Sequence, residues 1–142
     1  MAFGKDIPSA DREQIEDLVS EFNWLLDHGI ADGFAELFTK TGIFTAAGRT
    51  RSGREELQEF AQNRVAEPKV SRTIHGSHLL RAVNGEEISG ELDYVLYMGP
   101  AVGFRAAEAT TVGSYIDTYR HEDGAWRIHT RESRQVFTRP KP

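Results

Sequence analysis

Four long segments with the alternating pattern of β-strands fill the second half of the chain and constrain its fold more than any other feature. They are expected over residues 70–83, 87–98, 109–121 and 125–137. Asn84-Gly85 and Asp123-Gly124 each separate two of them, and such dipeptides favour the tight turns of β-hairpins. A longer loop is expected over residues 99–106. The sequence therefore predicts a meander of antiparallel strands.

The first half of the chain has the spacing of helices. Residues 1–10 are expected to form a loose arm, and Asp11 is expected to cap the first helix with Gln14 as its capping-box partner. Apolar residues then recur three and four positions apart until Gly29, a natural helix end. This apolar stripe comprises Ile15, Leu18, Val19, Phe22, Leu25 and Leu26.

Shorter elements are expected between that helix and the meander. Asp32 begins a short helix, and residues 42–47 form a short strand. A capping box of Ser52 and Glu55 begins another helix, which ends before Pro68.

Helices followed by antiparallel strands place the chain in the α+β class. We expect the sheet to curl around the N-terminal helices and to leave a pocket between them. Because no repeat, linker or low-complexity segment interrupts the pattern, a single domain is expected over residues 11–138.

Composition excludes several classes of protein. The chain has 142 residues and no cysteine, so disulfides and thiolate metal sites are excluded, and a reducing cytoplasm is the expected location. The net charge of −5 disfavours a nucleic-acid binder, which would more often be basic. No apolar run approaches the ~20 residues of a membrane span, and no apolar signal segment starts the chain.

Five segments in order resemble the SnoaL-like branch of the nuclear-transport-factor-two-like superfamily, a cone-shaped α+β fold. The segments are FNWLLDHG (22–29), ELFTKTGIF (36–44), the Gly53-Arg54 helix start, SRTIHGSH (71–78) and VGSYIDTYRHEDGAWRIHTRES (112–133). Within that branch the chain looks most like the scytalone dehydratase, bile-acid dehydratase and hexachlorocyclohexane dehydrochlorinase group. The resemblance implies elimination of water or HCl by a His–Asp dyad.

Asp27 and His75 fall on the dyad positions. The resemblance implies that His75 takes a proton from carbon and that Asp27 orients its ring, since a carboxylate fixes an imidazole's tautomer. A strand histidine satisfied by a backbone partner, and an exposed aspartate in the last helical turn, are the structural alternatives.

Arg131 falls where the dehydrochlorinase carries a pocket arginine, and its fork of donors suits an anionic group. A salt bridge is the alternative. Alternation along a regular strand places Arg131 on the same face as His129 and on the opposite face from Trp126 and Ile128, which look like core residues. Trp126, Ile128 and Arg131 can all be buried only if the strand has a bulge or if the sheet is buried on both faces. Phe22 departs from the family pattern, because the relatives have a polar side chain there.

Several apolar and aromatic side chains are expected to bind the substrate, with Tyr94 or Tyr115 as a replacement for the donor missing at Phe22. The substrate-binding set is Phe22, Trp24, Tyr94, Met98 and Tyr115. His75 and His78, three apart in a strand, are expected to face opposite sides and not to share a metal ion. No metal and no cofactor are expected.

The sequence thus predicts a small cofactor-independent lyase, of the dehydratase or dehydrohalogenase type, for an apolar cyclic molecule. The alternatives are an isomerase or cyclase using the same proton abstraction, a ligand-binding protein, and a structural subunit like the β subunits of ring-hydroxylating dioxygenases. A homotrimer is expected, as in the dehydratase relatives, with a dimer as the second choice.

Overall fold

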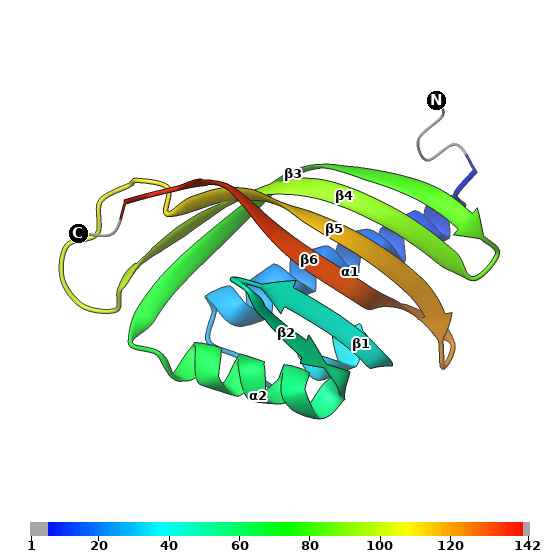
Figure 1. Ribbon diagram of the computed structural model, residues 1–142, viewed down its shortest axis with the longest axis horizontal. Coiled ribbons are helices and arrows are strands. Elements are labelled where there is room, and N and C mark those ends of the chain that lie inside the picture. The colour runs from blue at the N-terminus through cyan, green and yellow to red at the C-terminus, as the bar shows by residue number, and fades with distance from the viewer. Residues whose placement is uncertain (1–5, 141–142) are drawn as a thin grey trace.

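The computed structural model describes residues 6–140 and consists of helices on one side of a six-stranded sheet (Figure 1). The helices are α1 (Ser9–Asp27), the 3₁₀ turn η1 (Ala35–Leu37) and α2 (Gly53–Ala66). The strands are β1 (Phe38–Ala46), β2 (Arg49–Ser52), β3 (Lys69–Asn84), β4 (Glu87–Pro100), β5 (Thr111–Glu122) and β6 (Ala125–Thr138).

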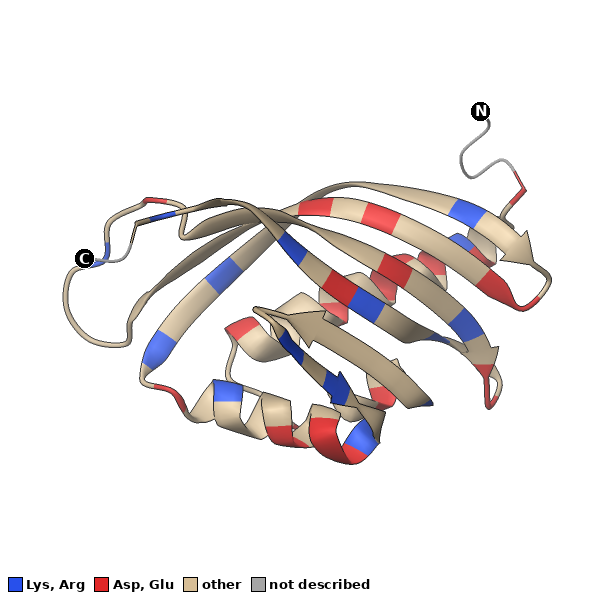
Figure 2. Cartoon of the chain, viewed as in Figure 1, with Lys and Arg blue, Asp and Glu red and all other residues tan. Residues whose placement is uncertain are grey.

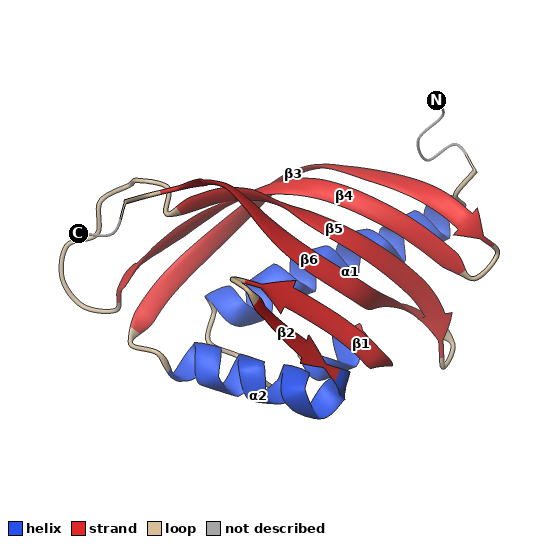
Figure 3. Ribbon diagram, in the orientation of Figure 1, coloured by secondary structure: helices blue, strands red, loops and turns tan. Residues whose placement is uncertain are grey.

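The strands lie in the order β2-β1-β6-β5-β4-β3, and only the β1–β6 pair is parallel. The long strands bend across the molecule, with α1 along their inner side and α2 against the β1–β2 end (Figure 3). The predicted α+β class, with N-terminal helices in a curved antiparallel sheet, is confirmed.

Both predicted hairpins are present. Asp123 and Gly124 have φ of 53° and 80°, the pair of positive values that a type I′ turn requires. In the other hairpin Asn84 still pairs with Glu87, so Gly85 and Glu86 form the turn itself. The short strand β2 was not predicted.

Several predicted caps are wrong. The first helix begins at Ser9, with Pro8 at the cap position, so Asp11 lies inside the helix; residues 1–5 of the expected arm lie outside the described residues. Gln14 instead accepts a hydrogen bond from the backbone N–H of Trp126. Ser52 is at the predicted cap position, but its side chain makes no capping hydrogen bond, and the side chain that reaches back to its N–H is Glu56, one residue beyond the predicted Glu55.

Gly29 ends α1 as predicted, with a φ of 71°, and the N–H of Ile30 closes the turn on the carbonyl of Leu25 at 2.9 Å. The helix predicted to start at Asp32 is a single 3₁₀ turn, after which Phe38 already belongs to β1. The short strand predicted over residues 42–47 is therefore β1, which begins four residues earlier, at Phe38.

Two bulges decide which polar side chains face inward. In β3, Gly76 and Ser77 together oppose one residue of β4, since His75 pairs with Tyr94 and His78 with Leu92. In β6, His129 is the extra residue between Ile128 and Thr130. The prediction that His75 and His78 face opposite sides is therefore wrong: the bulge in β3 brings both to the inner face.

The second bulge resolves the parity conflict in β6. Trp126, Ile128 and Arg131 are all buried, because the inserted His129 shifts the alternation by one position. His129 itself contacts Thr39 Oγ1 through Nδ1 at 2.8 Å. One of the two arrangements that the sequence allowed, a bulge, is thus the observed one.

Phe22 is the centre of the hydrophobic core and is 1% exposed. Its ring lies 5.2 Å from that of Phe34, 5.5 Å from that of Phe44 and 5.9 Å from that of Tyr115. These aromatic contacts join α1 to β1 and β5, so the helix is fixed against the inner face of the sheet.

Charged residues of both signs are interspersed along the strands and helices (Figure 2). Among the described residues, no helix combines the length and the apolar character that a membrane crossing requires.

Candidate active site

A cavity of about 260 Å³ lies between the C-terminal part of α1 and the inner face of the sheet. Its walls combine a carboxylate and hydroxyl groups with apolar and aromatic surface. Lining residues include Phe22, Asn23, Asp27, Thr73, Tyr94, Met98, Tyr115 and Ser133. Of the predicted substrate-binding set, Phe22, Tyr94, Met98 and Tyr115 thus lie on this cavity.

Asp27 is the carboxylate of the cavity. Its Oδ1 accepts hydrogen bonds from Ser71 Oγ at 2.6 Å and from Thr73 Oγ1 at 3.2 Å, and its Oδ2 accepts one from the backbone N–H of Thr73 at 2.7 Å. Arg64 on α2 donates to the same Ser71 oxygen at 2.9 Å. The last turn of α1 is therefore fastened to β3, and the carboxylate has a fixed orientation.

His75 lies two residues further along β3, on the same face as Thr73. Nδ1 of His75 accepts a hydrogen bond from Asn23 Nδ2 at 3.2 Å. Because Asn23 precedes Asp27 by one helical turn, the helix and strand make two parallel contacts, Asp27 with Thr73 and Asn23 with His75. The predicted hydrogen bond between Asp27 and His75 is not formed within the described residues.

The reason is that each group has a nearer partner, which the sequence analysis did not single out. Ser71, Thr73 and His75 alternate along β3, so period 2 identifies them as one face of the strand. Asn23 stands four residues before Asp27 and shares its side of the helix. The two-residue spacing along β3 and the four-residue spacing along α1 were the signals in the sequence that could have identified these polar partners.

A pair of hydroxyl groups belongs to the sheet wall of the cavity. Tyr94 Oη and Ser133 Oγ lie 2.7 Å apart, and the Tyr94 ring stacks on that of Tyr115 with centroids 4.4 Å apart. A Cβ at Gly113 would come within 2.8 Å of Tyr94 Oη, so the glycine leaves room for this hydroxyl. Burial raises the pKa of Tyr115, so its phenol is protonated at neutral pH.

Trp24, which was predicted to bind the substrate, does not line the cavity. Its side chain points outward, is 60% exposed and stacks on His28 with centroids 3.7 Å apart. Trp24 is off the apolar stripe of α1, so the helical turn directs it to solvent while Phe22 and Leu25 face the core.

Arg131 is fully buried and forms a bidentate ion pair with Asp117. Nε lies 2.9 Å from Oδ1 and Nη2 2.7 Å from Oδ2. The guanidinium carbon lies 4.4 Å from the centroid of Phe22 and 4.1 Å from that of Tyr115. Arg131 is thus separated from the cavity by two rings that line it, and its Nη1 has no hydrogen-bond partner.

Burial alone would lower the pKa of Arg131, but the paired Asp117 outweighs this effect and the pKa is raised. The guanidinium therefore stays charged inside the core. Of the two roles left open by the sequence for Arg131, the salt bridge is what the structure contains.

The ion pair continues into a chain of polar side chains toward the surface. Tyr119 Oη donates to Asp117 Oδ2, and His78 Nε2 lies 2.9 Å from the same phenol oxygen. Since Tyr119 has only one proton to donate, His78 must donate to it through Nε2. Nδ1 of His78 then faces Glu16 Oε1 at 3.2 Å, in a geometry that makes no hydrogen bond.

Among the side chains linked from Arg131 to His78, histidine is the type whose ordinary pKa lies nearest to physiological pH. Burial lowers the pKa of His78, and the charges of Glu16 and Asp117 oppose this shift. The described residues include no cluster of three or more His, Cys, Asp or Glu side chains with metal-site geometry. His75 and His78 share a face but have different partners, Asn23 for the first and Tyr119 for the second.

Comparisons with known proteins agree with this architecture. Residues 8–132 match the SnoaL-like domain family. No curated protein matches the chain closely enough to count as a relative.

Among solved structures, Rv3472 from Mycobacterium tuberculosis, described as a protein of unknown function, has 26% identity and a TM-score of 0.79, over 90% of this chain and 77% of that one. An NTF2-like protein with a cystatin-like fold from Novosphingobium aromaticivorans has 23% identity and a TM-score of 0.72, over 89% and 82%. A hexachlorocyclohexane dehydrochlorinase, LinA type 2, has 20% identity and a TM-score of 0.80, over 94% and 90%.

The last two likenesses show the shared fold and leave the reaction open. The family match covers most of the chain, including α1 with Asp27, the whole of β3 and the part of β6 that carries the bulge at His129. The chain therefore belongs to the SnoaL-like domain family, within the NTF2-like fold.

Proposed function

We propose that this protein is a small cofactor-independent lyase, of the dehydratase or dehydrohalogenase type, for an apolar ring-containing molecule. The observation that carries the proposal is the Asp27 carboxylate in a largely apolar cavity, with the Tyr94–Ser133 hydroxyl pair on the sheet wall. A carboxylate base and hydroxyl donors are the two kinds of group that proton abstraction from carbon needs.

In the proposed reaction Asp27 takes the proton from a carbon next to a carbonyl group or a leaving group. The electron pair of the broken C–H bond forms the new double bond, and the leaving group departs from the adjacent carbon as halide, or as water once a hydroxyl donor has protonated it. Asp27 then returns its proton to solvent, and a hydroxyl donor that has protonated the leaving water regains a proton from solvent. Ser71 and Thr73 hold the carboxylate in place but leave it as the acceptor.

His75 was predicted from sequence to be the base and stays a proposal in a modified role. Its Nδ1 already accepts a hydrogen bond from Asn23, which puts the proton of the neutral ring on Nε2. We propose that His75 positions the face of α1 that carries Asp27, whereas Asp27 itself touches the substrate. Arg131 would act from behind Phe22 and Tyr115, through its field rather than by contact.

The size of the cavity limits the substrate. About 260 Å³ is below the ~300–1,000 Å³ common for drug-sized ligands, so a single small ring with its substituents fits best. The apolar lining of Phe22, Leu26 and Phe44 favours a hydrocarbon or halogenated ring over a sugar.

An isomerase is the second candidate, because the same base and donors stabilise an enolate that is reprotonated at another carbon. A plain ligand-binding protein would need only the cavity, without the base. A dioxygenase-like structural subunit would need neither the cavity nor the base. We also propose a cytoplasmic location and a homotrimer, with a dimer as the alternative.

The test is proton exchange at carbon. Small cyclic ketones, cyclic alcohols and halogenated rings are incubated with the protein in D₂O and followed by NMR. We expect deuterium uptake at the carbon that loses its proton, or release of water or halide, for at least one compound class. Binding without exchange or elimination in all classes would identify a binding protein instead.

The hydroxyl pair supplies a further prediction. Tyr94→Phe should lower turnover by about 100-fold, the usual effect of removing one donor to the developing negative charge. Tyr115→Phe serves as the matched control, because it removes a hydroxyl from the ring stacked on Tyr94 and keeps both rings in place. Turnover of both variants at saturating substrate checks this: equal losses would mean that the Tyr94 hydroxyl has no special role.

A further inference from the structure

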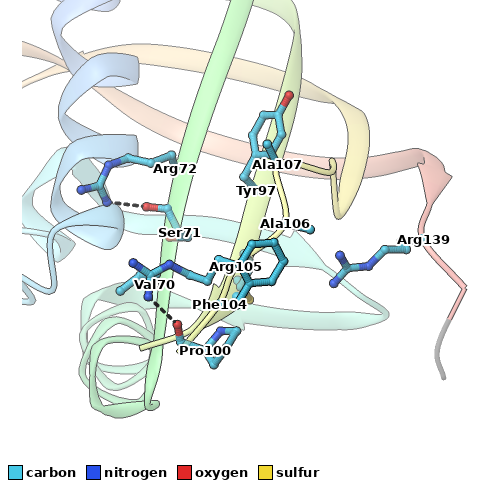
Figure 4. Close-up of a pocket in the computed structure, with 12 residues that line it drawn as sticks. Val70, Ser71, Arg72, Tyr97, Pro100, Phe104, Arg105, Ala106, Ala107 and Arg139 are labelled. Carbon is cyan, nitrogen blue, oxygen red and sulfur yellow. Dashed lines mark hydrogen bonds between the residues drawn. The ribbon is translucent and has the colours of Figure 1, made fainter. Parts of the chain in front are cut away.

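A hollow of about 570 Å³ lies beside one end of β3 and β4 (Figure 4). Tyr97 and Gly99 of β4 line it, and Met98 between them lines both this hollow and the inner cavity. The hollow therefore opens mainly on the outer face of β4 and borders the inner cavity at Met98. The loop between β4 and β5 covers it with Phe104, and we call it the outer groove.

The outer groove is basic although the whole chain is acidic. Its lining includes Arg72, Arg105 and Arg139 and no Asp or Glu, against a net charge of −5 for the chain. Arg139 faces the carboxylate of Glu108, whose Oε2 is 3.9 Å from Nη1 and whose side chain is 69% exposed.

The arginine positions are fixed by specific contacts. Nη1 of Arg105 donates to the carbonyls of Pro100 at 2.9 Å and Ala101 at 3.1 Å. A Cβ at Gly99 would lie 3.1 Å from Cγ of Arg105, so a glycine there allows the side chain to lie flat on the strand. The backbone N–H of Arg139 is bonded to the carbonyl of Thr110 at 2.9 Å, at the base of the same loop.

The groove also has aromatic surface that is exposed to solvent. Phe104 is 90% exposed, and in Figure 4 its ring lies between the guanidinium groups of Arg105 and Arg139. Tyr97, Val70 and Pro100 extend this apolar surface. An exposed phenylalanine beside two arginines suits a ligand with an apolar body and a negative end.

We propose that the outer groove binds a small organic anion with an aromatic body. Its carboxylate, sulfonate or phosphate would lie between Arg105 and Arg139, and its ring would pack on Phe104 and Tyr97. Arg105, Arg139 and Phe104 do not line the inner cavity, and the inference does not depend on the proposed lyase activity.

The test uses two fluorescent probes that share a ring system and differ in charge, 1-anilinonaphthalene-8-sulfonate and neutral N-phenyl-1-naphthylamine. We expect the sulfonate to bind more tightly, and the double variant Arg105→Gln/Arg139→Gln to raise its Kd about tenfold while the Kd of the neutral probe is unchanged. Added salt should weaken the sulfonate alone.

The matched control is Arg120→Gln/Arg134→Gln, which changes the net charge equally at two exposed arginines outside the groove. Equal weakening by both double variants would overturn the proposal, as would equal affinity of the two probes for the unmodified protein. Light-scattering mass is measured on the unmodified protein and on Phe104→Ser. A drop in mass on this substitution would show that a second copy occupies the groove and would also overturn the proposal.

Discussion

Arg131→Met should destabilise the protein by ~3–5 kcal/mol, the usual cost of leaving a buried charge without its partner. Asp117 is 2% exposed and would lose both hydrogen bonds from the guanidinium, keeping only the one from Tyr119. Methionine roughly preserves the contacts with Phe22 and Tyr115, so packing changes little. Urea unfolding followed by circular dichroism measures the change.

Two companion variants make that result specific. Arg134→Met removes an arginine that is 60% exposed and pairs with Glu132, so we expect almost no change in stability. Arg131→Met/Asp117→Leu removes both buried charges and should recover most of the lost stability. If the double variant were as unstable as the single one, the cost would come from packing and not from the unpaired carboxylate.

Asp27→Asn should abolish most of the turnover found in the exchange assay, by ~100–10,000-fold, because an amide cannot accept the proton from carbon. The variant keeps the size of the side chain and one oxygen that can accept a hydrogen bond from Ser71 or Thr73. We therefore expect the fold to remain, checked by the circular dichroism spectrum, while kcat falls.

His75→Gln separates the two assignments of the base. If Asp27 is the base, this variant retains more activity than Asp27→Asn, since Asn23 can bond to a glutamine amide instead. Asp93→Asn is the matched control, because that carboxylate pairs with Ser114 on the outer face and should leave turnover unchanged. Loss of activity in His75→Gln together with retention in Asp27→Asn would restore the role that the sequence assigned to His75.

The sequence was sufficient for the elements whose signals are local. Gly29 and the Asp123-Gly124 turn mark chain reversals by their backbone preferences, and the alternation over the last four strands gives their extent. The cap at Asp11 was wrong because Pro8 starts the helix three residues earlier without any side-chain cap.

The site was predicted in part. Phe22, Tyr94, Met98 and Tyr115 line the cavity as expected, since periodicity alone places them on inward faces. The polar partners were not predicted, because a hydrogen bond such as Asn23 to His75 depends on how α1 is registered against β3. Spacing along one chain says nothing about that register.

The two bulges have a consequence for insertions and deletions in this family. The buried chain from Arg131 through Asp117 and Tyr119 to His78 needs an extra residue in β3 and another in β6. Loss of either residue would turn His78 or Arg131 to solvent and bring a neighbour of unsuitable polarity inside. A related chain without both extra residues must therefore have a different interior, so strand length in an alignment indicates whether the buried charges can exist at all.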